Sequence, residues 1–568
     1  MQNDDLGEGR SWRCASRGIL IAILALSACG DDGGSAIDAA SVIDSAVADA
    51  SSTADAAAID AGVNVTTFVN PPEWTDTAGV YELTIQAAEV VIDGTTYCLR
   101  TWNGSLPGPT LRIPSGTARQ VRVDFTNAMT TEDLQTVGPP GGPTYDFNKA
   151  NLHTHGLHVQ PEMATGTAFL ADNVLVHHTA GETAQYRFDI DEDEATRGRP
   201  HEPGTFWYHS HVHGSTAIQV ANGMAGAIIV EGTVDALAGI STAEERIFIM
   251  THIPLAGATP LPAGTACNDA SLSINNFMLV AGAPTSVQVN GLIKPRIVVP
   301  PGQVERWRLV HGGVTQQMDL QIFASTDDSC TATTGAALNF HQIAQDGITF
   351  PAANQRDHVF MAPGNRADIM VTAPSTDGVY CLAYDQAGAT MVVAILEVAS
   401  GAGTATGAVP SDSDLASSAL PLISCSDPVD GTQDAIFSQQ VDSTSGAECE
   451  GGPPGGLKFN INCKTFNPAT PRVITVNRTE EWALSSEGGG SHPFHIHVNP
   501  FQVCSGTING EAQTPHWRDT VWVDQTGGTA LTFRTVYENY TGSFVNHCHK
   551  LHHEDQGMME IVRIDPAP

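Results

Sequence analysis

The sequence predicts an all-β protein of three similar Greek-key β-sandwich or barrel domains. Three observations support this class: apolar and polar residues alternate in short runs, one strand pattern recurs three times along the 568 residues, and long helical patterns are scarce. The 55 glycines and 33 prolines are typical of the many turns that such domains need. At 41% hydrophobic residues the chain has enough apolar side chains for several cores.

The alternation is clearest in Arg119–Phe125. Val121, Val123 and Phe125 alternate with polar residues there. Successive side chains of a strand point to opposite faces, so this stretch is predicted to be a strand with one buried face.

The start of this strand recurs downstream. Ile113-Pro114-Ser115-Gly116 precedes the strand, and Val299-Pro300-Pro301-Gly302 precedes a similar run with Trp307 and Leu309. A weaker third copy begins at Val476-Asn477 and leads to Trp482 and Leu484. Because three copies spread over the chain share one local pattern, we expect three copies of one β unit.

A second pattern recurs near the end of each unit. The three stretches begin with glycine and run through aromatic or apolar residues: Gly204–His211, Gly378–Asp385 and Gly542–His549. The first and third end in a His-x-His pair, whereas the second has Ala383 and Asp385 there. Metal chemistry is therefore expected to be shared by the first and third units.

These repeats set the predicted domain organisation. The first domain is expected at residues 66–235, the second, without metal, at 236–399, and the third at 421–568. Residues 400–420, rich in Gly, Ala and Ser, are predicted to be a linker.

The N-terminal segment is interpreted as an export signal. Arg10, Arg13 and Arg17 precede the short apolar run Gly18–Leu26, which is typical of a signal peptide. The sequence Leu26-Ser27-Ala28-Cys29 resembles a bacterial lipobox, which implies cleavage after residue 28 and a lipid anchor on Cys29. Residues 30–65, rich in Ala, Asp and Ser, are predicted to be a disordered tether. We therefore expect an exported lipoprotein facing the periplasm or the cell exterior.

The charge balance excludes one class of partner. Against 62 Asp and Glu the chain has 26 Lys and Arg, a net charge of −36. Nucleic-acid binding needs a basic surface, so no nucleic-acid partner is expected. The acidity is interpreted first as keeping an exported protein soluble, and attraction of cationic substrates is the less favoured alternative.

Ten of the 21 histidines fall into four compact clusters. They are His153 and His155; His209 and His211; His492, His495 and His497; and His547 and His549 with His553. Residues i and i+2 of a strand point to the same side, so each His-x-His pair is expected to direct two imidazoles to one place. Imidazole binds several transition metals, so histidine alone does not identify the ion.

The last cluster identifies the metal. Cys548, His553 and Met558 follow one another at short spacing after a predicted strand, and His492 supplies a second imidazole. Two His and one Cys with a weak axial Met form the ligand set of blue-copper sites. Zinc favours four firm ligands and iron–sulfur clusters need more thiolates, so neither fits as well.

The four clusters resemble the copper-binding signatures of the multicopper oxidases, the family of laccases and bacterial cuprous oxidases. The resemblance covers about residues 66–568 and implies three cupredoxin-like domains and four copper ions per chain. It implies a type 1 copper held by His492, Cys548, His553 and Met558. It places a type 2 copper on His153 and His495. The type 3 pair would take His155, His209, His211, His497, His547 and His549.

The same resemblance implies an activity. A small donor would give up single electrons at the type 1 copper, Cys548 would carry them onward, and O2 would be reduced to water at the other three. Glu554 and Asp172 are the candidates for proton relay, with a hydrogen bond to a ligand histidine as the alternative role for either. Asp519 lies in a motif similar to one of the family and is interpreted as structural support before substrate contact.

Eight further cysteines are available for disulfides in an exported protein: Cys98, Cys267, Cys330, Cys381, Cys425, Cys449, Cys463 and Cys504. Their even number allows up to four bridges, and the pairing cannot be deduced from sequence.

Three functions remain open at this stage. The first is a laccase-like oxidase of phenols and aromatic amines, which the 12 methionines without a Met-rich cluster favour. The second is an oxidase of Cu(I), Fe(II) or Mn(II), which the acidic composition favours. The third is a copper-binding or electron-transfer protein without turnover, and the complete set of four clusters argues against it. The donor and the oligomeric state are not encoded in a readable pattern.

Overall fold

The computed structural model describes residues 66–568 except 77, 116–119, 138–141, 164–165, 191–200, 283, 442–456, 488–489 and 526–529. The predicted signal peptide with Cys29 and the predicted tether lie outside the described residues. Among the helices that are described, none is both long and apolar enough to cross a bilayer.

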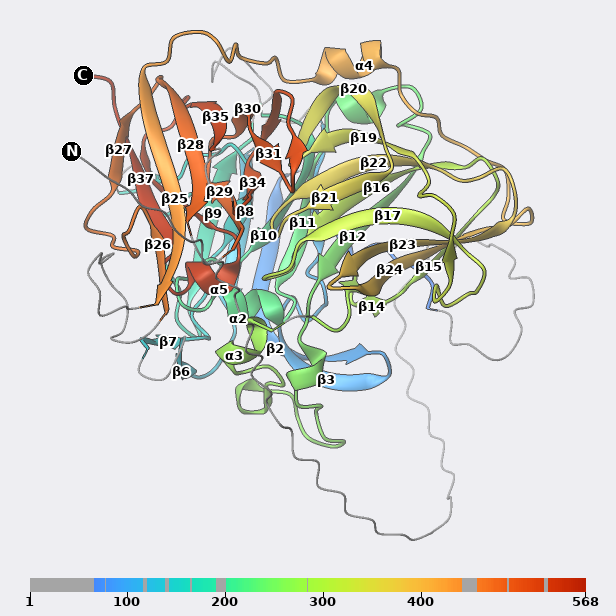
Figure 1. The fold of residues 1–568 in the computed structure, drawn as a ribbon. Helices are drawn as coiled ribbons and strands as arrows, with labels where there is room; N and C mark the ends of the chain where they lie inside the picture. Colours follow the sequence, from blue (N-terminus) through green and yellow to red (C-terminus); the bar gives the residue numbers. More distant parts are fainter. Residues whose placement is uncertain are drawn as a thin grey trace, which may run out of the picture. The chain divides into compact units, whose positions relative to one another are not determined.

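The described chain is nearly all β, as the sequence predicts (Figure 1). The large sheets form three pairs, and each pair lies within one of the three expected domain ranges. One compact unit spans residues 64–568.

The first domain pairs a five-stranded sheet with a four-stranded sheet. The five strands, in sheet order, are β1 (Glu73–Thr75), β4 (Thr110–Ile113), β11 (Ala225–Val230), β10 (Gly204–His209) and β8 (His153–His155). The four are β3 (Thr95–Trp102), β2 (Val80–Ile92), β5 (Gln120–Asn127) and β9 (Thr183–Asp189). The additional elements are β6 (Leu134–Thr136), β7 (Thr144–Asp146) and α2 (Thr216–Ala221).

The second domain has a seven-stranded and a six-stranded sheet. The seven are β14 (Leu292–Ile293), β13 (Gln288–Val289), β12 (Glu244–Thr251), β16 (Val304–His311), β22 (Arg366–Thr372), β19 (Phe340–Gln345) and β20 (Ile348–Arg356). The six are β15 (Arg296–Val299), β24 (Ala389–Val398), β23 (Gly378–Gln386), β17 (Met318–Ser325), β18 (Thr333–Thr334) and β21 (His358–Met361), which pairs with β17. Its short helices are η2 (Leu255–Gly257), η3 (Asp269–Ser271) and α3 (Phe277–Val280), and η1 (Thr233–Ala236) lies at the boundary with the first domain.

The third domain has a six-stranded and a five-stranded sheet. The six are β26 (Leu457–Ile461), β25 (Gly431–Val441), β28 (Thr479–Glu487), β35 (Leu531–Val536), β30 (Phe501–Ser505) and β33 (His516–Arg518). The five are β27 (Arg472–Thr475), β37 (Met559–Asp565), β36 (Gly542–Cys548), β29 (His492–Ile496) and β34 (Thr520–Val523). The hairpin of β31 (Thr507–Ile508) and β32 (Glu511–Ala512) and the helix α5 (Leu551–Glu554) complete it.

The sequence repeats correspond to equivalent strands. Each domain contains a strand before the recurring turn and one after it: β4 and β5, β15 and β16, and β27 and β28. The strand after the turn pairs in parallel with β2, β12 or β25, respectively. The glycine-initiated strands β10, β23 and β36 each pair antiparallel with the next strand of the chain. In β5 the buried and partly exposed positions alternate as the apolar pattern predicts.

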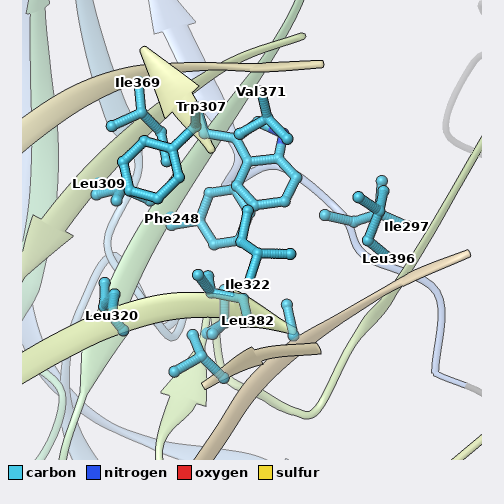
Figure 2. Packing of buried hydrophobic residues seen from close by; sticks show 14 of the residues in the cluster. Phe248, Ile297, Trp307, Leu309, Leu320, Ile322, Ile369, Val371, Leu382 and Leu396 are labelled. Carbon is cyan, nitrogen blue, oxygen red and sulfur yellow. The ribbon is translucent and has the colours of Figure 1, made fainter. Parts of the chain in front are cut away.

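Each sandwich encloses its own apolar core. In the second domain Phe248, Trp307 and Leu309 of one sheet face Leu320 and Ile322 of the other (Figure 2). Trp307 is only 1% exposed, and its Nε1 donates a 2.8 Å hydrogen bond to Glu305. The burial of such aromatic and aliphatic side chains is the main favourable contribution to folding.

The segment expected to be a linker contains a short helix. Helix α4 (Asp412–Ser418) begins at Ser411, whose side chain accepts a hydrogen bond from the Asp414 N–H. Leu415 is fully buried in one cluster with Val304 and Met370 of the second domain and with Val234 at the end of the first. Part of this segment is therefore attached to the second domain by an apolar contact that its Gly- and Ala-rich composition conceals.

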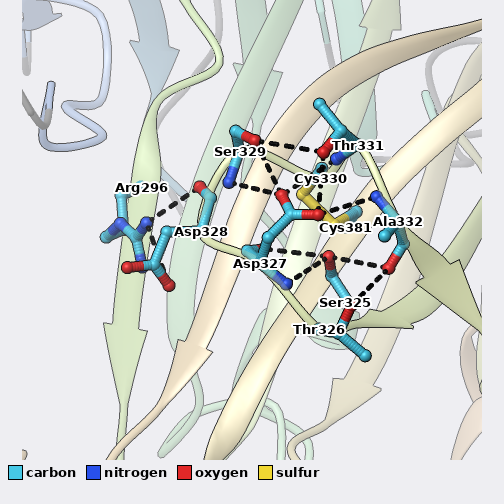
Figure 3. The surroundings of a disulfide bond; sticks show 10 residues. All are labelled: Arg296, Ser325, Thr326, Asp327, Asp328, Ser329, Cys330, Thr331, Ala332 and Cys381. Atoms are coloured by element: carbon cyan, nitrogen blue, oxygen red, sulfur yellow. Dashed lines mark hydrogen bonds and ion pairs between the residues drawn. A yellow bond between two sulfur atoms is a disulfide. The ribbon is translucent and has the colours of Figure 1, made fainter.

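Three disulfides are described: Cys98–Cys267, Cys330–Cys381 and Cys425–Cys504. Cys463 is also disulfide-bonded. Figure 3 shows the second bridge, which joins the loop between β17 and β18 to β23. The same loop is ordered by Asp327, whose carboxylate accepts hydrogen bonds from Ser329, Thr331 and Ala332.

Candidate metal centres

Among the described residues, five groups of buried side chains have ligand atoms close enough to hold a metal ion; the fifth, His153, Asp172 and His497, includes a carboxylate, and the other four consist only of ligands inferred from sequence. These four are His153, His155 and His495; His155, His209 and His549; His211, His497 and His547; and His492, Cys548 and His553. Within each group the ligand atoms lie within 4.8 Å of one another. These groups contain eleven of the twelve ligands inferred from sequence, and the twelfth is Met558.

The group with the cysteine lies entirely in the third domain. The Nδ1 of His492 lies 3.4 Å from the Cys548 Sγ, the Sγ lies 3.7 Å from the His553 Nδ1, and the two Nδ1 atoms are 3.2 Å apart. Metal bonds of about 2.0–2.3 Å to nitrogen and sulfur give ligand separations of this size. Met558 is fully buried in the same apolar cluster as Cys548, and its carbonyl accepts a 3.0 Å hydrogen bond from the Cys548 N–H.

The histidine-only groups form where strands of two domains meet. Strand β8 pairs with β10, which places His153 opposite His209. Strand β29 pairs with β36, which places His495 opposite His547. The His155 ring stacks on the His495 ring at a centroid distance of 3.7 Å, so the first and third domains share these groups.

The arrangement differs from the prediction that each His-x-His pair serves one place. His153 and His155 share one group, but His155 also belongs to a second. His209 and His211 lie in different groups, as do His547 and His549. The end of one strand can reach two neighbouring metal positions. That residues i and i+2 point to the same side of a strand does not determine which of the two positions each histidine ring serves.

Many of the imidazoles have a buried nitrogen that lacks a hydrogen-bond partner. The Nδ1 atoms of His153, His209 and His495 lie 2.8 to 3.0 Å from oxygens of Asp172, Ser210 and Asp519. A backbone carbonyl can only accept, so Nδ1 of His209 and His495 carries the proton, and the Nε2 lone pair remains. The Nε2 atoms of all three rings are buried without a hydrogen-bond partner. A metal cation satisfies such lone pairs, and a hydrogen bond to the other ring nitrogen is the usual support of a metal-binding histidine.

A second observation points to the same conclusion. The Nε2 atom of His547 lies 3.1 Å from the Nε2 of His211 and 3.4 Å from that of His497. The His547 Nδ1 donates to the Cys548 carbonyl at 3.1 Å, so its Nε2 is a lone pair facing two other nitrogens. Burial lowers the pKa of His211 to about 3 and that of His547 to about 4, so both rings are neutral near pH 7. The residues present therefore fit transition-metal ions.

The thiol of Cys548 is also shaped by burial. Burial raises its pKa to about 12, so in the absence of a metal the sulfur keeps its proton. A metal ion binds the thiolate, and loading this group therefore releases a proton.

Glu554 lies against the group of His211, His497 and His547. Its Oε2 is 3.1 Å from the His547 Nδ1, its Oε1 is 3.4 Å from the His211 Nδ1, and Thr216 donates a 3.3 Å hydrogen bond to it. Burial raises the pKa of this carboxyl to about 7. The sequence indicates Glu554 only through its position after His553. Its contact with a different group arises because α5 turns the chain back toward β36.

Asp172 supports His153. Its carboxylate lies 3.0 Å from the His153 Nδ1 and accepts a 3.0 Å hydrogen bond from the Thr154 N–H. Burial raises the pKa of Asp172 to about 7. Asp172 thus contacts one of the predicted ligand histidines directly, through the ring nitrogen on the side away from the buried Nε2.

Sequence reasoning missed the contribution of the second domain. Arg366 of β22 forms two hydrogen bonds to Asp519, at 2.8 and 2.5 Å, and the Asp519 carbonyl accepts from His495. Asn365 donates to the Thr520 carbonyl at 2.9 Å. These residues lie far from any histidine cluster in the sequence, so no local motif identifies them. Asp519 itself has the supporting role inferred for it.

Two neighbouring histidines lie outside the groups. His552 directly precedes His553 in the sequence, and its Nδ1 lies 3.2 Å from the Thr315 hydroxyl. His213 packs against the rings of Tyr145 and Phe466. Neither belongs to a group of ligand atoms among the described residues.

Comparisons with known proteins agree with this geometry. Two family models, both described as multicopper oxidase, match residues 147–235 and 438–568. A laccase from Haloferax volcanii is 25% identical over 478 residues, which cover 81% of this chain and 76% of that protein.

Solved structures show the same fold. A multicopper oxidase from Campylobacter jejuni, described as a metallo-oxidase, matches with a TM-score of 0.62 and 20% identity over 89% of this chain and 94% of its own. The McoA multicopper oxidase from Aquifex aeolicus matches with a TM-score of 0.64 and 20% identity over 89% of this chain and all of its own (100%). At this level of identity the structures establish the fold alone.

Proposed function

The chain is a member of the multicopper oxidase family, a copper-dependent oxidoreductase that uses O2, and we propose that it oxidises small organic donors such as phenols and aromatic amines. Each donor gives up one electron, and four electrons and four protons convert O2 to two molecules of water. The laccases among the relatives of this chain support an organic donor.

The observation that carries the proposal is the segment His547-Cys548-His549. Cys548 belongs to the group with His492 and His553, while His547 and His549 belong to two different histidine groups. A few covalent bonds of the backbone therefore join an electron-accepting centre to a centre with room for several metal ions. A protein that only stores copper has no need of this link.

We assign the ligands as the sequence implied them. His492, Cys548, His553 and Met558 would hold the type 1 copper, and His153 and His495 the type 2 copper. Two triads would hold the type 3 pair: His155, His209 and His549, and His211, His497 and His547. Copper, when bound, supplies one-electron redox chemistry and the reduction of O2. The count of four ions per chain follows from this assignment.

The protein residues supply orientation and protons. Asp172 fixes the His153 ring through Nδ1 and so keeps its Nε2 lone pair free for a metal. Glu554, buried and in contact with two ring nitrogens, holds a proton at a carboxylate oxygen next to the histidine groups. We propose that Glu554 delivers protons during turnover and that Asp172 acts mainly by positioning His153.

Oxygen uptake with a panel of donors tests the function. The copper-loaded chain is expected to consume one O2 per four electrons taken from a phenol or an aromatic amine. The variant Cys548→Ser should lose the intense thiolate-to-copper absorption while keeping the remaining copper ions, as measured by metal analysis. Persistence of that absorption in Cys548→Ser, or loading with far fewer than four ions in the parent chain, would contradict the assignment.

A metal-ion donor is the second candidate. The net charge of −36 attracts cations, and one structural neighbour is described as a metallo-oxidase. Uptake of O2 with Cu(I), Fe(II) or Mn(II) that exceeds uptake with every organic donor would establish this alternative.

We also propose that the chain is exported and anchored by a lipid on Cys29. The basic head, the apolar run Gly18–Leu26 and the lipobox-like sequence support it. In a bacterial host the protein should partition with membranes, and Cys29→Ala should release it into the soluble fraction.

A further inference from the structure

A cavity of about 420 Å³ lies between the first and third domains. The first domain lines it with β6, β7 and the stretches 174–177 and 211–213, and the third with Phe466, Pro468, β36 and β37. The volume is within the range of sites for small molecules. Among the described residues of the ligand groups, only His211 lines the cavity, and no residue of the group with Cys548 does. The cavity is therefore separate from the centre at which we propose that the donor is oxidised.

The walls of the cavity are mainly apolar. Val174 of the first domain and Val545 and Met559 of the third are buried in one apolar cluster, and Phe466 packs against it. Leucines, further valines, a proline and the ring of Tyr145 make up most of the remaining lining. Wall atoms of an apolar cavity have no partner on its open side, so an apolar molecule that enters supplies the missing contacts.

Two exposed leucines add apolar surface to the same cavity. Leu134 of β6 is 61% exposed and Leu175 is 39% exposed, and both belong to its lining. A molecule that covers them removes apolar surface from water, which is favourable in proportion to the area covered.

The lining has no net charge. With its histidines counted neutral, its charged residues are Asp146 and Lys149, one of each sign. The carboxylate of Asp146 is already engaged, because its Oδ1 accepts hydrogen bonds of 2.7 and 3.0 Å from the N–H groups of Asp133 and Asn148. An anion or a cation would lose its hydration without gaining a matched partner, so the lining favours an uncharged molecule.

His213 provides a polar contact among these apolar walls. Its ring packs against the rings of Tyr145 and Phe466 at centroid distances of 5.4 and 4.8 Å, which fix its position. The residue is partly exposed, and its Nδ1 is buried without a partner, so Nε2 is the ring nitrogen left accessible. In the part of the chain that the structure describes, no group is hydrogen-bonded to this Nε2. A hydroxyl group of a ligand can pair with it in either direction, because a hydroxyl both donates and accepts.

We propose that this cavity binds a small uncharged aromatic alcohol, whose ring contacts Val545, Met559 and Leu175 and whose hydroxyl pairs with the His213 Nε2. Because His211 also lines the cavity, the bound molecule lies beside the histidine groups without being a ligand of a metal. The proposal does not depend on which donor the enzyme oxidises.

Calorimetric titration of the copper-loaded chain under nitrogen, which prevents turnover, tests the class of ligand. Benzyl alcohol is expected to bind one per chain and more tightly than benzoate or benzylammonium, which have the same ring and opposite charges. Absence of saturable binding, or tighter binding of either charged molecule, would overturn the proposal.

Two variants test the position of the ligand. Leu175→Ser removes a partly exposed apolar contact and should weaken benzyl alcohol several-fold. Leu422→Ser is the matched control, since Leu422 is 50% exposed and does not line the cavity, and it should leave the affinity unchanged. Equal affinity in both variants and the parent chain would refute this cavity as the site.

His213→Phe tests the hydrogen bond separately from the apolar contacts. It keeps an aromatic ring between the same neighbours, so the affinity for toluene should be unchanged, while that for benzyl alcohol should fall about fivefold. Equal losses for the two molecules would overturn the role of His213. Should this variant not fold, the Leu175→Ser comparison still tests the cavity.

The thiolate-to-copper absorption distinguishes this cavity from the centre that contains Cys548. Saturating benzyl alcohol should leave this absorption of the parent chain unchanged, because no residue of that group lines the cavity. A shifted absorption, together with full affinity in Leu175→Ser, would place the molecule at that centre and refute the proposal.

Discussion

Arg366 is expected to be the most sensitive residue of the second domain for the stability of the metal centres. It is fully buried, and its guanidinium donates to the Asp519 carboxylate and to the carbonyls of Gly364, Asp346 and Thr205. Replacement by methionine keeps most of the side-chain volume and removes all five hydrogen bonds. The effect of this substitution therefore reports the loss of the positive charge and of its hydrogen bonds, with little contribution from lost side-chain volume.

The expected cost follows from the buried ion pair with Asp519. Removing one partner of such a pair destabilises a protein by about 3–5 kcal/mol. Even with Arg366 present, burial raises the pKa of Asp519 to about 6. In Arg366→Met this pKa rises further above its value in the unfolded chain. The penalty is then largest where Asp519 is charged, near pH 8, and decreases toward pH 5 as the carboxyl takes up a proton.

Urea denaturation of the copper-loaded chain at pH 8 and pH 5.5 measures this. Arg366→Met should lower the free energy of unfolding by about 3–5 kcal/mol at pH 8 and by less at pH 5.5. The double variant Arg366→Met with Asp519→Asn should recover part of the loss, because it leaves no unpaired charge. The exposed Arg563→Ala serves as the control. A loss below about 1 kcal/mol at pH 8, or no recovery in the double variant, would refute the reasoning.

Three other predictions concern separate parts of the chain. Met558→Leu should raise the potential of the type 1 copper, because an axial thioether stabilises Cu(II); a redox titration without an upward shift would remove this ligand. Removal of the Cys330–Cys381 bridge, with a sequence separation of 51 residues, should cost about 4 kcal/mol of loop entropy and lower the melting temperature in calorimetry. Burial raises the pKa of Glu245, but nearby arginines, Arg308 first, outweigh this and hold it well below its ordinary value. The ionised Glu245 therefore contributes its full stabilisation above about pH 4.5, and this contribution is lost as the pH falls further. Glu245→Gln should make the free energy of unfolding depend less on pH in the acid range. An unchanged pH dependence in that range would contradict this prediction.

Much of the fold could be predicted because each copy of the sequence repeat corresponds to the same strand of one domain. The turn before Val121 recurs before Trp307 and Trp482, and each copy forms an equivalent strand. Strand boundaries were harder to predict, since a pattern of two-residue period does not show where pairing ends. The helix containing Leu415 was missed because a single apolar residue in a Gly- and Ala-rich segment gives no periodic signal.

The ligand histidines could be recognised as clusters, but their division among groups could not. His155 and His549 are nearly 400 residues apart in the sequence and contribute to one group. Such a group depends on how β8 and the end of β36 face each other across two domains, and local spacing contains no information about that. The supporting residues Arg366 and Asn365 could not be predicted for the same reason. Each contacts the third domain through its side chain only, and no sequence pattern near them marks that contact.

The second domain supports the histidine groups although it supplies no ligand to them. The first and third domains contact each other directly, through the stacked rings of His155 and His495, and the second domain adds contacts to both. Arg308 of β16 bonds to Thr205 of the first domain, and Arg366 of β22 bonds to Asp519 of the third. Because β16 and β22 are neighbouring strands of one sheet, these two contacts are rigidly connected. The second unit, which has no ligands in these groups, is therefore suited to a structural role, in which its sheet helps to set the distance between the two sets of imidazoles.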